Sequence, residues 1–239
     1  MRRRTPIGRQ IEPRLVHVVV DDEEQPVLPT LFEGVALDRP RARSHTMTFS
    51  AVLLAGGESR RMGTDKATFL FRGKTLWQVQ LETLRKLRPA EIFLSARTDP
   101  SWRPNDVQFI ADILPSCGPL SGIAASLVKI RTAHLLALAV DLPLMTENYL
   151  RSICEAIEPG RGVVAKIDNR AEPLAAVYPR EAEIEFRTAL AGSDFSLENV
   201  VRHLVTSGKL LEISVTEQER RLFRNVNNAS DVDAAIAGD

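Results

Sequence analysis

The sequence has few of the residues that mark several common protein classes. Among 239 residues it holds two cysteines, Cys117 and Cys154, and four histidines, with no spacing typical of metal ligands. A disulfide-rich fold and a zinc module are thereby excluded, and two reduced cysteines indicate a cytoplasmic protein. His134 and His203 fall in apolar surroundings, so we expect both to be packed. No apolar run reaches the roughly 18–20 residues that cross a membrane.

The chain also lacks an excess of either charge and has few aromatic residues. Lys and Arg together number 31, as do Asp and Glu, which gives a formal net charge of zero. This balance excludes a general affinity for nucleic acid or an anionic membrane, so any phosphate-binding site has to be local. Aromatic residues make up 5% and hydrophobic residues 44% of the chain, which predicts an aliphatic core.

Residues 1–47 differ in character from the rest of the chain. They hold eight arginines, five prolines and no lysine, and an acidic run lies at 21–24. Only 15–20 resembles a strand, and no apolar segment of a targeting signal follows the arginines at 2–4. We expect a flexible or loosely docked extension, followed by one compact domain over 48–239.

From residue 48 onward, apolar strand patterns alternate with amphipathic helix patterns. The expected strands are 50–55, 91–95, 107–111, 134–140, 162–167, 173–178 and 210–215. The expected helices are 75–87, 118–130, 146–157, 180–191, 196–204 and 230–237. Because the strands are apolar on both faces, the pattern predicts an α/β fold with a mostly parallel sheet covered by helices.

A glycine-rich segment at 53–66 follows the first strand and reads Leu-Leu-Ala-Gly-Gly-Glu-Ser-Arg-Arg-Met-Gly-Thr-Asp-Lys. Gly56 and Gly57 permit positive φ and the close approach of a ligand. Arg61 and Lys66 add fixed cations behind them. Free backbone N–H groups and cations after a strand are what a polyphosphate requires, and a tight turn with solvated charges is the alternative. The segment fits neither the P-loop signature nor the dinucleotide fingerprint.

Two carboxylates also follow strands directly. Asp141 comes after 134–140 and has no basic neighbour in the sequence, so a salt bridge explains it poorly. A ligand for Mg²⁺ fits its position, and a cap of the following turn or helix is the alternative. Asp112 follows 107–111 and either binds a nucleotide or begins a turn. Since ligands collect beyond the carboxyl ends of parallel strands, we expect Gly56 and Asp141 at one site.

Three further segments are candidates, each with an ordinary alternative. Gly118 to Gly122 is either a rigid loop close to a ligand or a plain helix start. Asn225 and Asn227 place two amides on one side of an extended segment, or they form turns. The segment 172–174, Glu-Pro-Leu, puts a carboxylate before a strand near the acceptor side. No spacing indicates a Ser/His/Asp or Cys/His arrangement.

In this order, the segments resemble the molybdenum cofactor guanylyltransferase family. The segment 53–66 resembles its phosphate loop, and the similarity recurs at Asp112, 118–122, 140–143 and 223–231. The resemblance implies a Rossmann-like three-layer α/β/α sandwich that transfers GMP from GTP to molybdopterin bearing molybdenum (Mo-molybdopterin) and releases pyrophosphate. It implies Mg²⁺ as cofactor and a cytoplasmic monomer that meets molybdopterin-inserting or molybdoenzyme-specific proteins, without nucleic acid or membrane.

The resemblance also implies roles for individual residues. Lys66 and Arg61 would stabilise the phosphates, and Asp141 would bind Mg²⁺. The nucleotide would lie against Leu54, Ala55, Gly56, Gly57, Lys66, Ser95, Asp112 and Asp141. The acceptor and its phosphate would lie near Gly118, Gly122, Asn225 and Asn227. Ser95 replaces an asparagine common in the family, which leaves its contact open, and 228–230 depart from the usual Thr-Pro-Glu.

Three other functions stay open at this stage. A CTP-dependent cytidylyltransferase acting on the same pterin shares fold and chemistry, but Gly56, where such enzymes tend toward alanine, favours guanine. A nucleotidyltransferase for sugar phosphates or other small metabolites is disfavoured by the resemblance at 223–231. A non-catalytic nucleotide-binding adaptor is disfavoured because Lys66 and Asp141 are both present.

Overall fold

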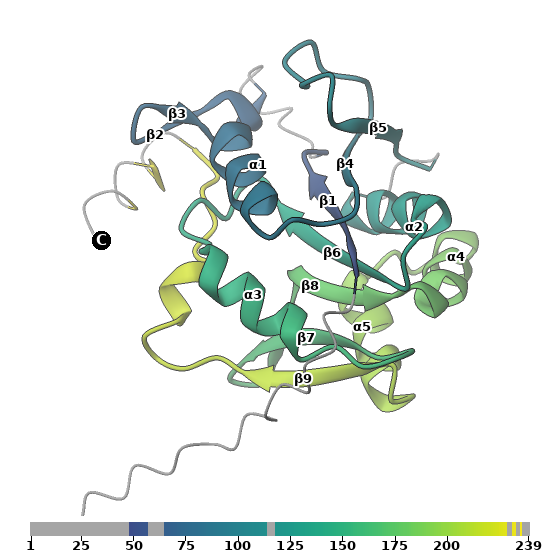
Figure 1. Cartoon of the computed structure of the whole chain (residues 1–239). Helices are drawn as coiled ribbons and strands as arrows, with labels where there is room; N and C mark the ends of the chain where they lie inside the picture. Colours follow the sequence, from purple (N-terminus) through teal and green to yellow (C-terminus); the bar gives the residue numbers. More distant parts are fainter. Residues whose placement is uncertain (1–47, 57–64, 114–117, 229–230, 233–234, 236–239) are drawn as a thin grey trace, which may run out of the picture. The chain divides into compact units, whose positions relative to one another are not determined.

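A computed structural model of the chain describes residues 48–56, 65–113, 118–228, 231–232 and 235, so the expected extension at 1–47 lies outside it. Within these residues, seven strands form one sheet in the order β5-β4-β1-β6-β8-β7-β9 (Figure 1). Its strands are β1 (Ser50–Leu54), β4 (Ile92–Ala96), β5 (Gln108–Ala111), β6 (His134–Ala139), β7 (Gly162–Ile167), β8 (Arg170–Pro179) and β9 (Leu210–Ser214). A separate hairpin pairs β2 (Leu70–Phe71) with β3 (Lys74–Thr75).

Helices cover both faces of the sheet, which confirms the predicted three-layer α/β/α arrangement (Figure 1). The α-helices are α1 (Leu76–Lys86), α2 (Pro119–Lys129), α3 (Glu147–Glu155), α4 (Glu183–Ala191) and α5 (Leu197–Thr206). Short 3₁₀ helices are η1 (Lys66–Thr68), η2 (Arg180–Ala182) and η3 (Arg220–Phe223). The helices α1 and α3 lie on one face, and α2, α4 and α5 lie on the other.

The central strand shows why its sequence is apolar without interruption. Successive side chains of a strand point to opposite faces, and here each face carries its own core. Ala51 and Leu53 pack with the core beneath α1 and α3, whereas Val52 and Leu54 pack with the core beneath α2, α4 and α5. Each fully buried aliphatic side chain contributes about 1.5–3 kcal/mol, so both layers hold β1 in place.

The strand order reverses between β1 and β6. From β1 the chain proceeds to β4 and then to β5 on one side, with all three strands parallel. It then returns to β6, which pairs parallel with β1 on its other side. Only β8 in this sheet runs antiparallel to its neighbours β6 and β7. The carboxyl ends of β1 and β6 therefore diverge into the crevice in which such sheets bind ligands.

Helix starts follow the capping residues in the sequence. Thr146 caps α3 by accepting from the Tyr149 N–H at 3.3 Å, and Ser196 caps α5 by accepting from the Asn199 N–H at 3.3 Å. The predicted helix at 180–191 divides into η2 and α4. The hairpin β2–β3 and the helix η3 were not predicted, and the predicted closing helix at 230–237 lies largely outside the described residues.

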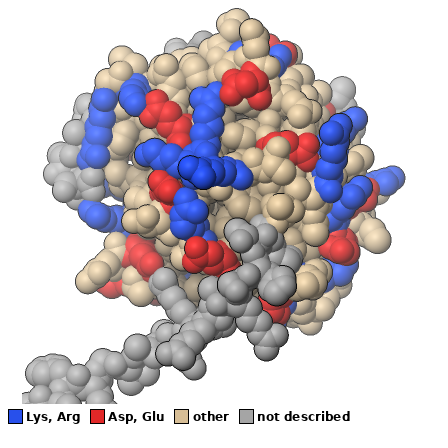
Figure 2. All heavy atoms as spheres, viewed as in Figure 1, with Lys and Arg blue, Asp and Glu red and all other residues tan. Residues whose placement is uncertain are grey.

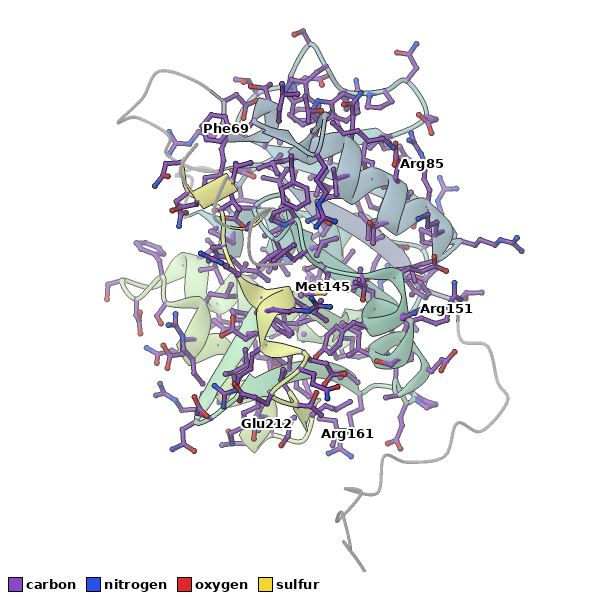
Figure 3. All side chains as sticks on the ribbon, turned by 90° about the vertical axis from the view of Figure 1, so that its left-hand side faces the viewer. Phe69, Arg85, Met145, Arg151, Arg161 and Glu212 are labelled. Atoms are coloured by element: carbon purple, nitrogen blue, oxygen red, sulfur yellow. The ribbon has the colours of Figure 1, made fainter. Side chains whose placement is uncertain are left out.

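Charges of both signs are interspersed on the surface. Figure 2 shows Lys and Arg side chains next to Asp and Glu side chains on the face viewed. Arg85 of α1 and Arg151 of α3 lie on one side of the molecule (Figure 3), and Arg151 donates to the Lys86 carbonyl at 3.2 Å. Each arginine also pairs with an acid, Asp106 at 2.8 Å and Glu147 at 2.6 Å respectively. Among the described residues, no helix has the length and apolar character that crossing a membrane requires.

Of the two histidines that we expected to be packed, one is buried and the other is exposed. His134 is fully buried in β6, as predicted, whereas His203 is exposed on α5, so that prediction is wrong. The exposed side of α5 includes His203 because only Val200, Val201 and Leu204 of that helix are buried. Cys154 is a free thiol that packs partly buried against the core, and its burial raises its pKa to about 12. Cys117 lies outside the described residues.

Candidate active site

A pocket opens at the reversal point of the sheet. The pocket and its open mouth together contain about 460 Å³ of space that no protein atom fills, part of which is open solvent. Its lining residues are Leu54, Ala55, Gly56, Asp65, Lys66, Pro119, Ala139, Val140, Asp141 and Leu174. The structure thus brings Gly56 and Lys66, from the two described ends of the glycine-rich segment, together with Asp141 at one pocket.

Backbone hydrogen bonds fix the floor of this pocket. The Ala55 N–H donates to the Ser95 carbonyl at 2.9 Å, and the Val140 N–H donates to the Leu54 carbonyl at 3.1 Å. These bonds continue the parallel pairing of β1 beyond its last residue on both sides. A further bond from the Val226 N–H to the Asp141 carbonyl, at 2.9 Å, anchors the C-terminal segment beside the pocket.

Lys66 joins two predicted site residues directly. Its Nζ donates to Asp141 Oδ2 at 3.1 Å and to Asn227 Oδ1 at 2.9 Å, across 75 and 161 residues of sequence. The side chains of Lys66 and Asp141 are 23% and 18% exposed, so the ion pair is accessible from the pocket. The prediction that Asp141 is poorly explained by a salt bridge is therefore wrong, because its partner is distant in sequence and close in space.

The second oxygen of Asp141 has a different environment. Oδ1 is buried and accepts no hydrogen bond from the described residues. A buried carboxylate oxygen without a donor is costly unless a cation or another donor reaches it. The described residues contain no group of three acidic, histidine or cysteine side chains arranged around a metal. A cation here would therefore take one carboxylate from the protein and its other ligands from substrate and water, which is the usual set for Mg²⁺.

Asp65 determines where Lys66 begins its helix. The Asp65 side chain adopts the N-cap position of η1, and Oδ1 accepts from the Ala67 N–H at 3.0 Å. Lys66 is consequently the first residue of η1, and the buried Ala67 ties this turn to the core. The Asp65 cap on one side and the buried Ala67 on the other hold the backbone of Lys66 at the edge of the pocket. Asp65 was not among the predicted site residues, although it lies in the glycine segment.

Ser95 and Asp112 form a buried pair behind Gly56, and neither of them lines the pocket itself. Ser95 Oγ donates to Asp112 Oδ1 at 2.8 Å, and both residues are buried. A Cβ added to Gly56 would lie 3.0 Å from Asp112 Oδ2 and 3.6 Å from the Ala96 Cα. Gly56 thus lets Asp112 approach the backbone closely, and its own φ is not positive. Lack of a side chain, rather than positive φ, is what this position requires.

The two glycines around the start of α2 serve different purposes. Gly118 has a φ of 66°, which glycine adopts easily, and it is the residue before α2. Pro119, the first residue of α2, lines the pocket. Gly122 packs against β4, where an added Cβ would lie 2.5 Å from Ser95 Oγ. The structure therefore places Gly122 beside the Ser95–Asp112 pair.

A large irregularity in β8 brings a further residue into the pocket. Ala176 pairs with Val164 of β7, but the next pair along is Glu172 with Ala165, so 173–175 have no partners on β7. The Tyr178 hydroxyl donates to the Pro173 carbonyl at 2.7 Å within this irregularity. Leu174 consequently lines the pocket. Glu172 is half-buried, and its burial raises the pKa of its carboxyl above the usual value.

Some predicted site residues are not part of the described pocket. Gly57 and Arg61 lie outside the described residues. Asn225 is exposed and does not line the pocket, whereas Asn227 contacts Lys66. Sequence reasoning did not name Ala139 and Val140 as site residues, although they immediately precede Asp141 and their position was the available signal.

The sequence comparisons with known proteins agree on one family. A profile of the MobA-like NTP transferase domain matches residues 51–207. A probable molybdenum cofactor guanylyltransferase of Opitutus terrae is 32% identical over 193 residues, which are 80% of this chain and 96% of that protein. A molybdenum cofactor guanylyltransferase of Syntrophotalea carbinolica is 29% identical over 76% of this chain and 88% of its own length.

Solved structures share the fold. Molybdopterin-guanine dinucleotide biosynthesis protein A of Archaeoglobus fulgidus aligns with a TM-score of 0.61 and 23% identity, over 80% of this chain and 99% of that one. The 2-C-methyl-D-erythritol 4-phosphate cytidylyltransferase of Thermus thermophilus aligns with a TM-score of 0.58 and 16% identity, over 80% and 98%. At these identities the likeness concerns the fold.

Proposed function

The chain belongs to the MobA-like NTP transferase family, and we propose that it transfers GMP from GTP to Mo-molybdopterin with release of pyrophosphate. The observation that carries this proposal is the meeting of Lys66, Asp141 and Asn227 at the reversal point of the sheet. A cation donor and a carboxylate with an unpaired buried oxygen are the groups that a magnesium triphosphate needs.

The ion pair suggests how the site accepts its substrate. Without a ligand, Lys66 offsets the charge of Asp141 at 3.1 Å. A bound triphosphate would offer Lys66 phosphate oxygens, and Asp141 would then turn to the cation that accompanies the nucleotide. Mg²⁺ bound at Asp141 would neutralise phosphate oxygens around the reacting phosphorus. We take this exchange of partners to be the first event of nucleotide binding.

The chemistry that follows needs little covalent work from the protein. An oxygen of the terminal phosphate of molybdopterin would form a bond to the α-phosphorus of GTP, in line with the bond from that phosphorus to the α–β bridging oxygen. The latter bond breaks, and pyrophosphate leaves with the bridging oxygen. Because the acceptor phosphate is largely ionised near neutral pH, no protein base is required. Lys66 would stabilise charge on the departing pyrophosphate, and Asn227 would orient Lys66 or the acceptor through its amide.

The buried Ser95–Asp112 pair is the proposed base-recognition element. Guanine presents two neighbouring donors on its Watson–Crick edge, N1–H and the N2 amino group, and a carboxylate is an acceptor for both. Ser95 donates to Oδ1 of Asp112, and Oδ2 lies beside Gly56, a residue that lines the pocket, so guanine would share this carboxylate with the partners that it already has. The corresponding edge of cytosine carries an acceptor at N3, which a carboxylate would repel.

Transfer of label from [α-³²P]GTP to Mo-molybdopterin tests this function. We expect a labelled dinucleotide and equimolar pyrophosphate only when the nucleotide, Mg²⁺ and the acceptor are all present. Label transfer from CTP in preference to GTP would overturn the guanine assignment and keep the transferase class. Tight nucleotide binding without transfer to the pterin would indicate a binding adaptor instead.

A further inference from the structure

The only two tryptophans of the chain lie face to face near the pocket. Trp77 of α1 and Trp102 stack with ring centroids 5.1 Å apart and an interplanar angle of 15°. Trp102 belongs to the connection 97–107 between β4 and β5, so the stack joins this connection to α1. Both side chains are half-buried, and such a pair contributes more than its buried area alone.

Trp102 also contacts the residue before the phosphate lysine. Its indole Nε1–H donates to Asp65 Oδ2 at 2.9 Å, while Asp65 Oδ1 accepts from the Ala67 N–H at 3.0 Å. Both oxygens of one carboxylate are thus held, one by the helix that Lys66 begins and the other by the indole. A carboxylate held at both oxygens cannot rotate without breaking a charge-assisted bond.

The connection that carries Trp102 is itself fastened at several points. Arg103 forms two hydrogen bonds to Asp99, both of 2.7 Å, and its Nη1 donates to the Val107 carbonyl at 2.6 Å. Asp106 accepts two hydrogen bonds from Arg85 of α1, at 3.0 and 2.8 Å. These hydrogen bonds and ion pairs fix the conformation of the loop that carries the Trp102 indole.

We propose that Trp102 is a positioning residue that sets the geometry of Lys66 through Asp65. The inference rests on the proposed function of Lys66 as the phosphate contact. Trp102 does not line the pocket, so its effect on nucleotide affinity should pass through Asp65 and η1. Since all the tryptophan of the chain is in this stack, its fluorescence should also respond when a triphosphate draws Lys66 away from Asp141.

A double-mutant cycle tests this coupling. The dissociation constant of GTP with Mg²⁺ is measured by calorimetry for wild type, Trp102→Phe, Lys66→Ala and the double variant. Phe keeps an aromatic ring in the stack but removes the N–H donor. We expect Trp102→Phe to weaken binding about fivefold when Lys66 is present and less than twofold when it is absent, because contacts in one network are not additive.

Two outcomes would overturn the inference. One is an equal loss from Trp102→Phe in both backgrounds, and the other is no loss in either. Trp77→Phe provides the contrast, because it changes the stack and keeps the indole donor, and we expect a smaller effect on affinity than from Trp102→Phe. In wild type, tryptophan emission should change with the same dissociation constant as calorimetry gives. Wild type that binds no nucleotide would contradict the proposed function, whereas binding indifferent to Trp102 would contradict this inference alone.

Discussion

At the scale of single residues, the charged and polar groups of the site pair with one another in the absence of a ligand. Lys66 and Asp141 form an ion pair that is accessible from the pocket, and Asn227 adds a second acceptor to the lysine. Because both side chains are largely buried, the cost of desolvating the two charges offsets much of their attraction, and the net contribution of the pair to stability is small. Removing one partner leaves the other charge without compensation, so variants here have to be measured for both activity and folding.

Lys66→Ala is the first test at this scale. Removing one preorganised contact from a transition state commonly costs a factor of 10²–10³ in turnover, and we expect a loss of about that size. Because this variant leaves the largely buried Asp141 carboxylate without its cation, we also expect a lower midpoint of thermal unfolding, and turnover is compared at a temperature at which both proteins are folded. Lys74→Ala is the matched control, because Lys74 pairs with Glu82 on the exposed surface at 2.6 Å. Near-normal GMP transfer by Lys66→Ala would remove this lysine from the mechanism.

At the scale of elements, packing between α2 and β4 supports the base-recognition side of the pocket. Gly122 of α2 lies against Ser95, which in turn holds Asp112. On the opposite side, the irregularity in β8 carries Leu174 into the pocket. Both features depend on two elements meeting, and neither side of the pocket would form from one segment alone.

Gly122→Ala tests this packing. The added Cβ would lie 2.5 Å from Ser95 Oγ and 3.0 Å from Leu54 Cδ2, so overpacking should outweigh the better helix propensity of alanine. We expect a net loss of about 1–2 kcal/mol in the free energy of unfolding, measured in urea. In a Ser95→Ala background the loss should shrink. At Gly192 the nearest atom would be 3.5 Å away, so Gly192→Ala should change stability by less than about 0.5 kcal/mol.

The helices and strands also show how much of the fold could be predicted from the sequence. Long apolar or amphipathic segments such as 134–140 and 75–87 were predicted within a residue or two, because their periodicity is strong. The strands β2 and β3 have two residues each and offer no period to detect. The start of β8 at Arg170 was missed, because the irregularity interrupts its alternation.

At the scale of the whole molecule, the parallel sheet gathers remote residues at one edge. Alternation predicted that Gly56 and Asp141 would share a site, because both follow central parallel strands. The contact of Lys66 with Asp141 could not be predicted, since it depends on the path of the chain over 75 intervening residues. The choice of Asn227 over Asn225 likewise depends on how the C-terminal segment crosses the pocket edge.

The amino end of the central strand β6, at the opposite end of this strand from the pocket, contains a buried titratable group. His134 begins β6, and its Nε2 donates to the carbonyls of Glu158 and Arg161, at 3.0 and 3.2 Å. Burial lowers its pKa from the usual value of 6.5, although these two bonds oppose the shift. Nδ1 is buried and has no hydrogen-bond partner among the described residues, so protonation would add an unpaired donor.

Stability should therefore fall as the pH falls below about 6.5. In that range the unfolded chain binds a proton that the native His134 does not, which destabilises the native state by up to about 1.4 kcal/mol per pH unit. Above that pH, His134 is neutral in both states and does not make the free energy of unfolding depend on pH. Urea unfolding between pH 5 and 8 should show a shallower dependence for His134→Gln than for wild type, with His203→Gln as control. Identical slopes in wild type and His134→Gln would contradict this account.

The central claim is that one triphosphate and its cation occupy the Lys66–Asp141 site together. The most direct measurement is the affinity of GTP as Mg²⁺ is titrated, for wild type, Asp141→Asn and the surface control Asp194→Asn, which lies before α5. We predict that Mg²⁺ strengthens binding at least about tenfold in wild type and in the control, and less than about twofold in Asp141→Asn, because the neutral amide is a weaker ligand. An equal effect of Mg²⁺ in Asp141→Asn would show that the cation binds elsewhere and would contradict the claim.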